Sequence, residues 1–185
     1  MNKPLQSLAN IRTGVFAKPI AQGEVVYLQS RHFDEGGRLI DHLHPDLMGY
    51  SFSEKHLLMA GDVLFAAKGT KNFAAVFESG NPPSVASTSF FVLSLKGTVV
   101  LPSYLAWYLN HPNTQALLKG EAKGTAIVSI SKNSLSELDI PVPAIEIQQL
   151  VLKIADLRKV EMSLKQRIER LKEKQLQQLI INAIN

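Results

Sequence analysis

An apolar heptad repeat occupies the C-terminal stretch of the chain, residues 147–185. Two interleaved series, one of leucines and one of isoleucines, give the alternating three- and four-residue spacing of a coiled-coil seam. The seam residues are Ile147, Leu150, Ile154, Leu157, Leu164, Ile168 and Leu171. Neither Gly nor Pro interrupts the stretch, so it predicts one helix, roughly 58 Å long at ~1.5 Å per residue. We expect the seam to face a second helix, in another chain or in a further part of this one.

Polar residues interrupt the seam at two positions, Glu161 and Gln175. A polar residue at such a position commonly fixes the register or orientation of the paired helices. Partial coverage of the helix at these positions is the simpler interpretation. Beyond Leu171 the apolar positions change phase, which predicts a different neighbour or a changed crossing there.

The net charge of the chain, +4, comes entirely from this stretch. Residues 1–146 carry 12 Lys/Arg and 12 Asp/Glu, whereas residues 147–185 carry 8 Lys/Arg and 4 Asp/Glu. The default interpretation is a pair of solvated flanks beside a coiled-coil seam. The alternative is a surface that faces the phosphates of DNA.

Composition limits the class of protein. Apolar residues make up 45% of the chain, so residues 1–146 can form a hydrophobic core. The absence of cysteine excludes disulfides, thiolate zinc sites and cysteine nucleophiles, and fits a reducing compartment. No signal peptide and no apolar run of ~18 residues is present. We therefore expect a cytoplasmic protein without a membrane partner.

Residues 1–146 mix strand and helix signals. Short runs rich in β-branched and aromatic residues predict strands at 24–29, 63–67, 73–77 and 89–95. Helical spacing follows at 102–109 and 114–118, with a break at His111-Pro112. We predict an α+β domain at 1–146, with a mixed sheet and short helices, followed by a long coiled-coil helix at 147–185.

Several short motifs occur in order along the chain. They are Gly61-Asp62-Val63-Leu64, Leu101-Pro102-Ser103-Tyr104-Leu105, Lys123-Gly124-Thr125 and Leu138-Asp139-Ile140-Pro141-Val142-Pro143. In this order, and running directly into the long helix, they resemble the specificity subunit of Type I restriction-modification systems, over residues from about 5 to 185. The sequence Glu146-Ile147-Gln148 departs from the Glu-Gln pair usual in that family by an inserted Ile.

The resemblance implies a function and an architecture. Family members carry two target-recognition domains, each followed by a long helix, and the two helices pair antiparallel as a spacer. This chain resembles one such half, so the resemblance implies that it pairs with a second copy or belongs to a longer subunit. It further implies a non-catalytic, sequence-specific binder of double-stranded DNA that reads one half-site. Methyltransferase and restriction subunits would be its partners, and it would need neither cofactor nor metal.

Candidate DNA contacts are residues that sit in protruding loops and can donate or accept hydrogen bonds. They are Arg12, Lys18, Arg31, Lys68, Lys71, Asn72, Lys123, Thr125, Ser131, Lys132 and Asn133. We expect Arg12 and Arg31 to contact guanine, since guanidinium groups bind its major-groove edge. Lys68, Lys71 and Lys123 suit phosphate. Each residue taken singly is equally compatible with an ordinary surface position.

Two other functions stay open at this point. Asn81-Pro82-Pro83-Ser84 resembles the Asn-Pro-Pro-aromatic motif of amino-methyltransferases, which makes a DNA methyltransferase fragment one alternative. Ser84 replaces the aromatic ring, however, and no glycine-rich turn is present to hold a cofactor. The other alternative is a coiled-coil adaptor that does not bind DNA. His42 and His44 are interpreted as loop histidines rather than metal ligands.

Overall fold

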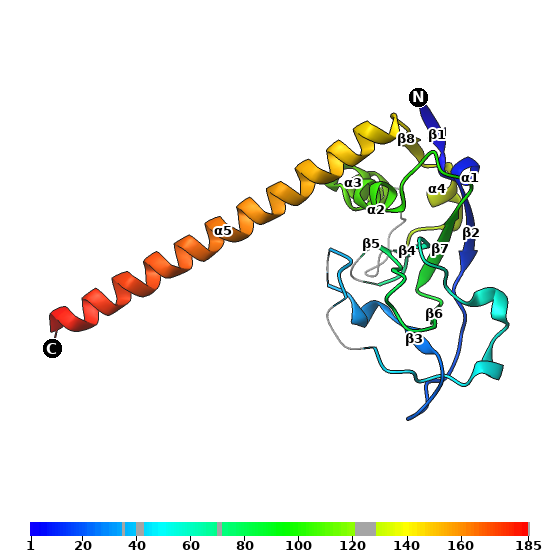
Figure 1. Ribbon diagram of the computed structural model, residues 1–185, viewed down its shortest axis with the longest axis horizontal. Helices are drawn as coiled ribbons and strands as arrows, with labels where there is room; N and C mark the ends of the chain where they lie inside the picture. The colour runs from blue at the N-terminus through cyan, green and yellow to red at the C-terminus, as the bar shows by residue number, and fades with distance from the viewer. Residues whose placement is uncertain (35, 40–42, 70–71, 121–128, 185) are drawn as a thin grey trace. The chain divides into compact units, whose positions relative to one another are not determined.

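The computed structural model describes residues 1–34, 36–39, 43–69, 72–120 and 129–184. The chain divides into two compact units, Met1–Ile145 and Glu146–Asn185. Figure 1 shows the first as a set of short strands and helices and the second as a single long helix.

A four-stranded antiparallel sheet forms the centre of the N-terminal unit. Its order is β2 (Ala9–Thr13), β7 (Phe90–Leu95), β4 (Val63–Ala66) and β5 (Ala74–Val76). Every residue of β4 is buried, because this central strand is covered on both faces. In the register of the sheet, Leu64 lies between Val92 and Ala75.

Two small sheets complete the strand pairing of the described residues. β3 (Val26–Leu28) runs parallel to β6 (Ser84–Ala86). β1 (Asn2–Pro4) pairs antiparallel with β8 (Asp139–Pro141), which joins the beginning and the end of the N-terminal unit. Both parallel and antiparallel pairs are therefore present.

Short helices accompany the sheets: α1 (Leu5–Leu8), α2 (Pro102–Asn110), α3 (Pro112–Gly120) and α4 (Lys132–Glu137). Proline at the first position of α2 favours helix initiation there, and the helix ends where Pro112 disfavours helical backbone at His111. Asn110 attaches the end of α2 to β5, since its side chain accepts from Ala74 N at 2.7 Å and donates to Ala74 O at 2.8 Å.

An aromatic cluster lies in the core between the strands and the loop that follows β3. The ring centroid of Phe33 lies 5.4 Å from that of Phe73 and 5.8 Å from that of Phe90, and the last two are 6.0 Å apart. The Phe33–Phe90 and Phe73–Phe90 pairs are edge-to-face, an orientation that aromatic rings prefer. Phe33 thereby anchors an otherwise irregular loop to the sheet.

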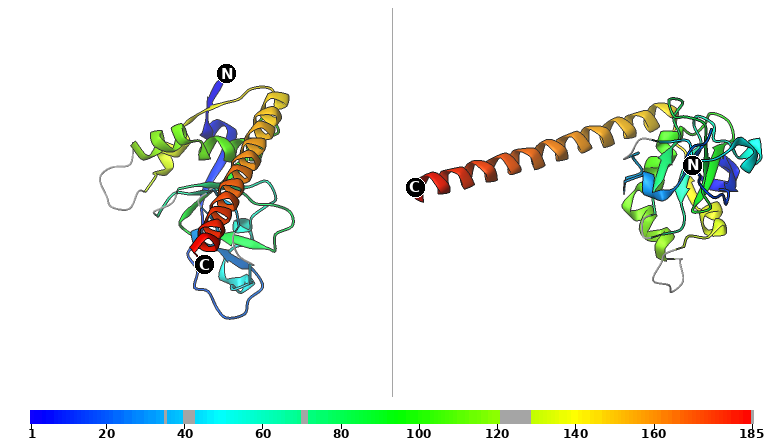
Figure 2. Two further views of the ribbon diagram at one scale, coloured as in Figure 1. Left: turned by 90° about the vertical axis from the view of Figure 1, so that its left-hand side faces the viewer. Right: turned by 90° about the horizontal axis from the view of Figure 1, so that it is seen from below.

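The second unit is α5 (Ile145–Ile184), an uninterrupted helix of 40 residues that Figure 2 shows in two further views. The seven predicted seam residues of α5 are 48% to 60% exposed. The structure therefore confirms the predicted α+β class with a long C-terminal helix, while the pairing of that helix stays a prediction. No helix within the described ranges is long and apolar enough to cross a membrane.

Candidate nucleic-acid interface

The loop after β3 presents Arg31 to solvent. Residues Ser30–His32 form a single 3-10 turn, in which the side chains of Gln29 and His32 cap each other's backbone. Arg31 is exposed, and its Nε lies 3.4 Å from His32 Nε2, so the guanidinium lies beside the imidazole ring. Its terminal guanidinium nitrogens have no hydrogen-bond partner among the described residues, so they are available to an external acceptor.

A tight turn follows and exposes a second arginine. Asp34 Oδ1 accepts from the backbone N–H groups of Gly36 and Arg38, both at 2.8 Å. Gly37 has a φ of +78°, and a Cβ there would lie 2.3 Å from Ala74 O, so a larger residue would not fit. Arg38 is exposed beside this turn. Arg38 is not among the predicted contacts, although a basic residue after Gly36-Gly37 is a loop signal of the same kind.

The end of β4 brings together two segments that are far apart in sequence. Lys68 and Ser129 form an antiparallel bridge, and Ile130 N donates to Ala67 O at 2.9 Å. Lys68 is exposed. Asn72 is only 8% exposed, and its Nδ2 donates to Ala66 O at 2.9 Å. Asn72 thus stabilises the backbone near the end of β4, while Lys68 is free to point its ammonium group into solvent.

The segment after Ile130 enters α4. Ser131 caps this helix, because its Oγ accepts from Ser134 N at 3.0 Å. Lys132 and Asn133 form the first turn and are exposed. Among the three predicted contacts in this segment, Ser131 has a structural role and the other two are accessible.

Six of the predicted contacts therefore come from connected segments. The Phe33–Phe73 ring contact links the Arg31 loop to the start of β5, and the Lys68–Ser129 bridge links the end of β4 to the segment before α4. We call the exposed basic and amide residues of these segments the loop cluster. It consists of Arg31, Arg38, Lys68, Lys132 and Asn133.

The remaining predicted contacts are placed differently. Lys18 is exposed in the connection between β2 and β3, which bonds to another loop through Ile20 N and Asp46 O at 2.8 Å. Lys18 therefore lies in a different loop from the members of the loop cluster. Lys71, Lys123 and Thr125 lie outside the described residues.

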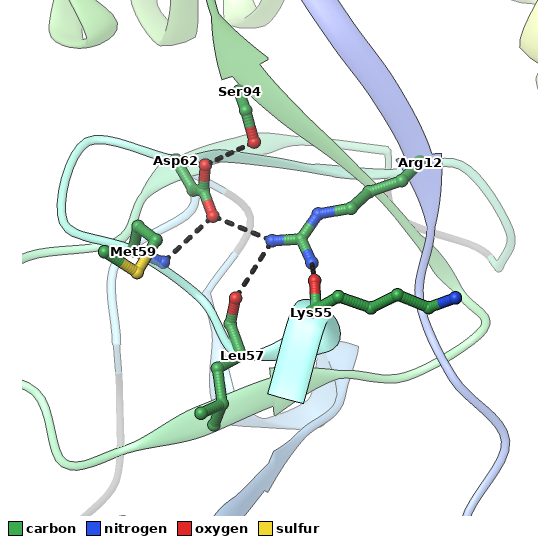
Figure 3. Close-up of polar contacts among 6 residues, drawn as sticks. All are labelled: Arg12, Lys55, Leu57, Met59, Asp62 and Ser94. Carbon is green, nitrogen blue, oxygen red and sulfur yellow. Dashed lines mark hydrogen bonds and ion pairs between the residues drawn. The ribbon is translucent and has the colours of Figure 1, made fainter. Parts of the chain in front are cut away.

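Arg12 lies in a hydrogen-bonded network inside the N-terminal unit (Figure 3). Its Nη1 donates to Lys55 O at 2.6 Å, and its Nη2 donates to Leu57 O at 3.1 Å and to Asp62 Oδ2 at 3.0 Å. The Arg12 side chain is 27% exposed and that of Asp62 only 4%. A guanidinium with three internal acceptors is a poor candidate for base contact, so we leave Arg12 out of the loop cluster.

Both carboxylate oxygens of Asp62, the ion-pair partner of Arg12, accept further hydrogen bonds. Asp62 Oδ2 also accepts from Met59 N at 3.0 Å, and Oδ1 accepts from Ser94 Oγ at 2.7 Å. Nearby, burial lowers the pKa of His56, with smaller contributions from the positive charges of Lys55 and Arg12. The network links β2, the turn before β4 and β7 around one buried carboxylate.

The Asn81–Ser84 stretch has a structural use. Pro83 O accepts from Val26 N at 2.9 Å, and Ser84 Oγ donates to Pro82 O at 2.7 Å. The first bond continues the parallel β3–β6 pairing, and the second is local to the turn before β6. Ser84 is fully buried. No group of three His, Cys, Asp or Glu residues able to hold a metal occurs in the described part of the chain.

The sequence of the chain was compared with models of known protein families and with curated proteins. A family model described as Type I restriction modification DNA specificity domain matches residues 11–176. No curated protein matches the chain.

Solved structures resemble the fold along most of this chain. One, reported under complex assembly and conformational transition of the type I R-M system, has a TM-score of 0.67 at 17% identity, covering 97% of this chain and 43% of that one. The HsdS subunit from Thermoanaerobacter tengcongensis has a TM-score of 0.67 at 20% identity, covering 95% and 46%. The Type-I restriction-modification S subunit from M. genitalium has a TM-score of 0.55 at 15% identity, covering 85% and 38%. This chain spans less than half the length of each.

Proposed function

The chain belongs to the family of Type I restriction-modification DNA specificity domains, and from that premise we propose that it reads one half of a bipartite DNA sequence while α5 pairs with a second copy. The observation that carries this proposal is the exposed apolar seam of α5, in a chain that spans less than half of the structures it resembles. Residues 1–146 are the target-recognition domain in this proposal, and residues 147–185 are the pairing helix.

The seam supports pairing through its energetics. The seam residues are half-exposed in the single chain, at 48% to 60%. A leucine or isoleucine gains roughly 1.5–3 kcal/mol when it is fully buried. A second helix packed along the seam would bury these residues over more than three heptads. Two target-recognition domains would then be held a fixed distance apart.

The loop cluster supports DNA recognition through its chemistry. Arg31 and Arg38 suit the O6 and N7 acceptors of guanine, and Asn133 suits adenine. Lys68 and Lys132 suit phosphate. Lys18, Lys71, Lys123 and Thr125 remain predicted contacts in loops beside or beyond this cluster. The Asp34 carboxylate also lies in this region. Its Oδ1 accepts from two backbone N–H groups, so its role there is to hold the turn that carries Arg38.

Catalysis is assigned to other subunits in this proposal. The chain would direct a methyltransferase subunit and a restriction subunit to the recognised cytoplasmic DNA, and would contribute neither cofactor nor metal. The Asn81–Ser84 stretch does not argue for a methyltransferase fragment, since Pro83 O already accepts from Val26 N. A calorimetric titration of the purified chain with S-adenosylmethionine separates the two functions, because a methyltransferase fragment would bind it.

The length of α5 provides the direct test. A repeat of residues 158–164, inserted after Leu164, keeps the heptad register and adds ~10.5 Å to the helix at ~1.5 Å per residue. We expect the non-specific spacer of the recognised sequence to grow by about 3 base pairs, at ~3.4 Å per pair. Selection from a random duplex pool with the assembled methyltransferase complex, followed by sequencing, measures the spacer.

A matched control appends the same seven residues after Asn185, beyond the predicted seam. This variant should select the original spacer. An unchanged spacer in the inserted variant, with intact half-sites, would show that α5 does not set the distance.

A further inference from the structure

The cations of α5 fall into two groups that differ in their ion pairing. Glu161 accepts from Arg158 and, at 2.6 Å, from Lys165. Lys172 pairs with Glu169 at 2.9 Å and Lys159 with Asp156 at 3.7 Å. We call these the paired cations: Arg158, Lys159, Lys165 and Lys172. The other group makes no ion pair with any residue that the structure describes: Lys153, Arg167, Arg170 and Lys174.

The two groups also occupy different sides of the helix. Lys153, Arg167 and Lys174 each come directly before a seam position, so they line one flank of the seam. Arg170 is three residues after Arg167 and four before Lys174, so it lies on the same face. We call this flank the unpaired edge.

Three of the paired cations lie on the opposite flank. Arg158, Lys165 and Lys172 each come directly after a leucine of the seam, whereas Lys159 lies on the outer face of the helix, between the two flanks. All of these cations are exposed. The helix therefore has one flank whose cations carry their own carboxylate partners and one flank whose cations do not.

The composition of the unpaired edge indicates what kind of partner it suits. It contains two carboxylates: Glu146, in the first turn of α5, and Asp156, which pairs with Lys159. Its apolar members, Val160, Ile181 and Ile184, are too widely spaced to form a continuous stripe. A second protein helix needs an apolar stripe, which this face lacks. A polyanion needs only exposed cations.

Antiparallel pairing of two α5 helices would bring the cations of the two unpaired edges close together. When two identical helices pair antiparallel, each flank meets the same flank of the other copy. The unpaired edge would then meet a second unpaired edge, and cations would face cations. An outside source of negative charge relieves this repulsion, and duplex DNA supplies one charge per ~1.7 Å along its axis.

We propose that the unpaired edge of α5 binds the phosphates of the duplex between the two half-sites. This inference rests on the proposed function, because it requires the paired helices to lie along the DNA. Arg167 and Arg170 offer planar, bidentate donors for phosphate oxygens, and Lys153 and Lys174 act as point charges. The contacts are independent of sequence, as is appropriate for a spacer whose bases are not read.

Two variants of equal charge test the proposal. One replaces the unpaired edge, K153Q/R167Q/R170Q/K174Q, and the other replaces the paired cations, R158Q/K159Q/K165Q/K172Q. Glutamine has nearly the helix propensity of lysine and arginine, and circular dichroism verifies that α5 still forms. The full chain and both variants are titrated against a fluorescent duplex of random sequence over a series of salt concentrations.

The slope of log K against log salt is the measured quantity. Each phosphate contact contributes about 0.9 to this slope on duplex DNA, so loss of four contacts per chain, eight per helix pair, lowers its magnitude by about 7. We expect this loss in the unpaired-edge variant and a slope close to the original in the control.

Each other outcome overturns the proposal in a recognisable way. Equal losses in both variants would indicate diffuse attraction rather than an edge. An unchanged slope in the unpaired-edge variant would assign these cations to a protein partner or to solvent, while the spacer test of the proposed function would still succeed. No salt-dependent binding by the unsubstituted chain would contradict both.

Discussion

The two units of the chain place their charged and apolar groups in opposite ways. In the N-terminal unit, the buried carboxylate of Asp62 is matched by Arg12 and further donors, and the sheet core is closed to solvent. In α5, seam residues such as Leu157 are half-exposed, and Arg167 has no ion pair within the described chain. The core of the first unit thus encloses its apolar side chains and this buried charge, whereas the second unit exposes apolar and cationic side chains along its length.

The largest expected effect concerns the core of the N-terminal unit. Phe65 lies on β4 and is fully buried, so Phe65→Ala should lower the free energy of unfolding by about 3–5 kcal/mol. Urea denaturation followed by fluorescence measures this change. Trp107 is the only tryptophan of the chain and lies in α2, so the signal reports on the N-terminal unit alone.

The matched control removes the same side chain from an exposed position. Phe16 is 77% exposed, so Phe16→Ala should change the unfolding free energy by no more than about 0.5 kcal/mol. Similar losses in both variants would contradict the placement of the core.

The next effect concerns the buried ion pair. Arg12→Ala leaves the Asp62 carboxylate, 4% exposed, without its cation. We expect a loss of about 2–3 kcal/mol, below the 3–5 kcal/mol of fully buried pairs because Arg12 is itself partly exposed. The same denaturation experiment measures it, with the exposed Arg31→Ala as control. A stable Arg12→Ala protein with impaired DNA recognition would instead restore Arg12 as a base contact.

A smaller effect is expected from a seam substitution. It should change the self-association of α5 and leave the folding of the N-terminal unit unaltered. Leu164→Ala should weaken self-association by about 2 kcal/mol, roughly 30-fold in Kd. Gln166→Ala, two residues away and off the seam, should leave the Kd unchanged. Sedimentation equilibrium measures the Kd, and Trp107 fluorescence should show unaltered unfolding of the N-terminal unit in dilute solution. A seam substitution that destabilised that unit would break the distinction between the two regions.

The smallest effect is a pH dependence in the middle of α5. Hydrogen bonds from Lys165 and Arg158 hold the pKa of Glu161 below its ordinary value of 4.5. A lowered pKa in the folded state stabilises the helix above that ordinary value, and this contribution is lost as the pH falls through the lowered pKa. Helix content by circular dichroism should therefore fall slightly more on acidification in the original chain than in Glu161→Gln. Equal acid profiles would show that these ion pairs contribute nothing in solution.

Local patterns in the sequence accounted for much of the fold. The long helix follows from a heptad repeat that needs no distant contact to be recognised. β4 and β7 follow from continuous apolar runs, which predict buried strands. The β1–β8 pair was missed, because a strand of three residues ending in Pro4 exists only through its pairing with residues 139–141.

The candidate site depended more on tertiary contacts. Arg12 has the residue type and the apparent position of a base contact, but its acceptor Asp62 is distant in sequence and only the fold brings them together. The approach of Lys68 to Ser129 is likewise a long-range contact. Arg38 follows Gly36-Gly37, a local turn signal that would have been sufficient to predict it as a loop cation.

The central claim is that the apolar seam of α5 is covered by a second copy of the same helix. The mass of the chain in solution, measured by sedimentation equilibrium over a series of concentrations, tests it most directly. The account predicts a rise from 20.4 kDa at high dilution to twice that value as the concentration increases. A mass of 20.4 kDa at every concentration would contradict it.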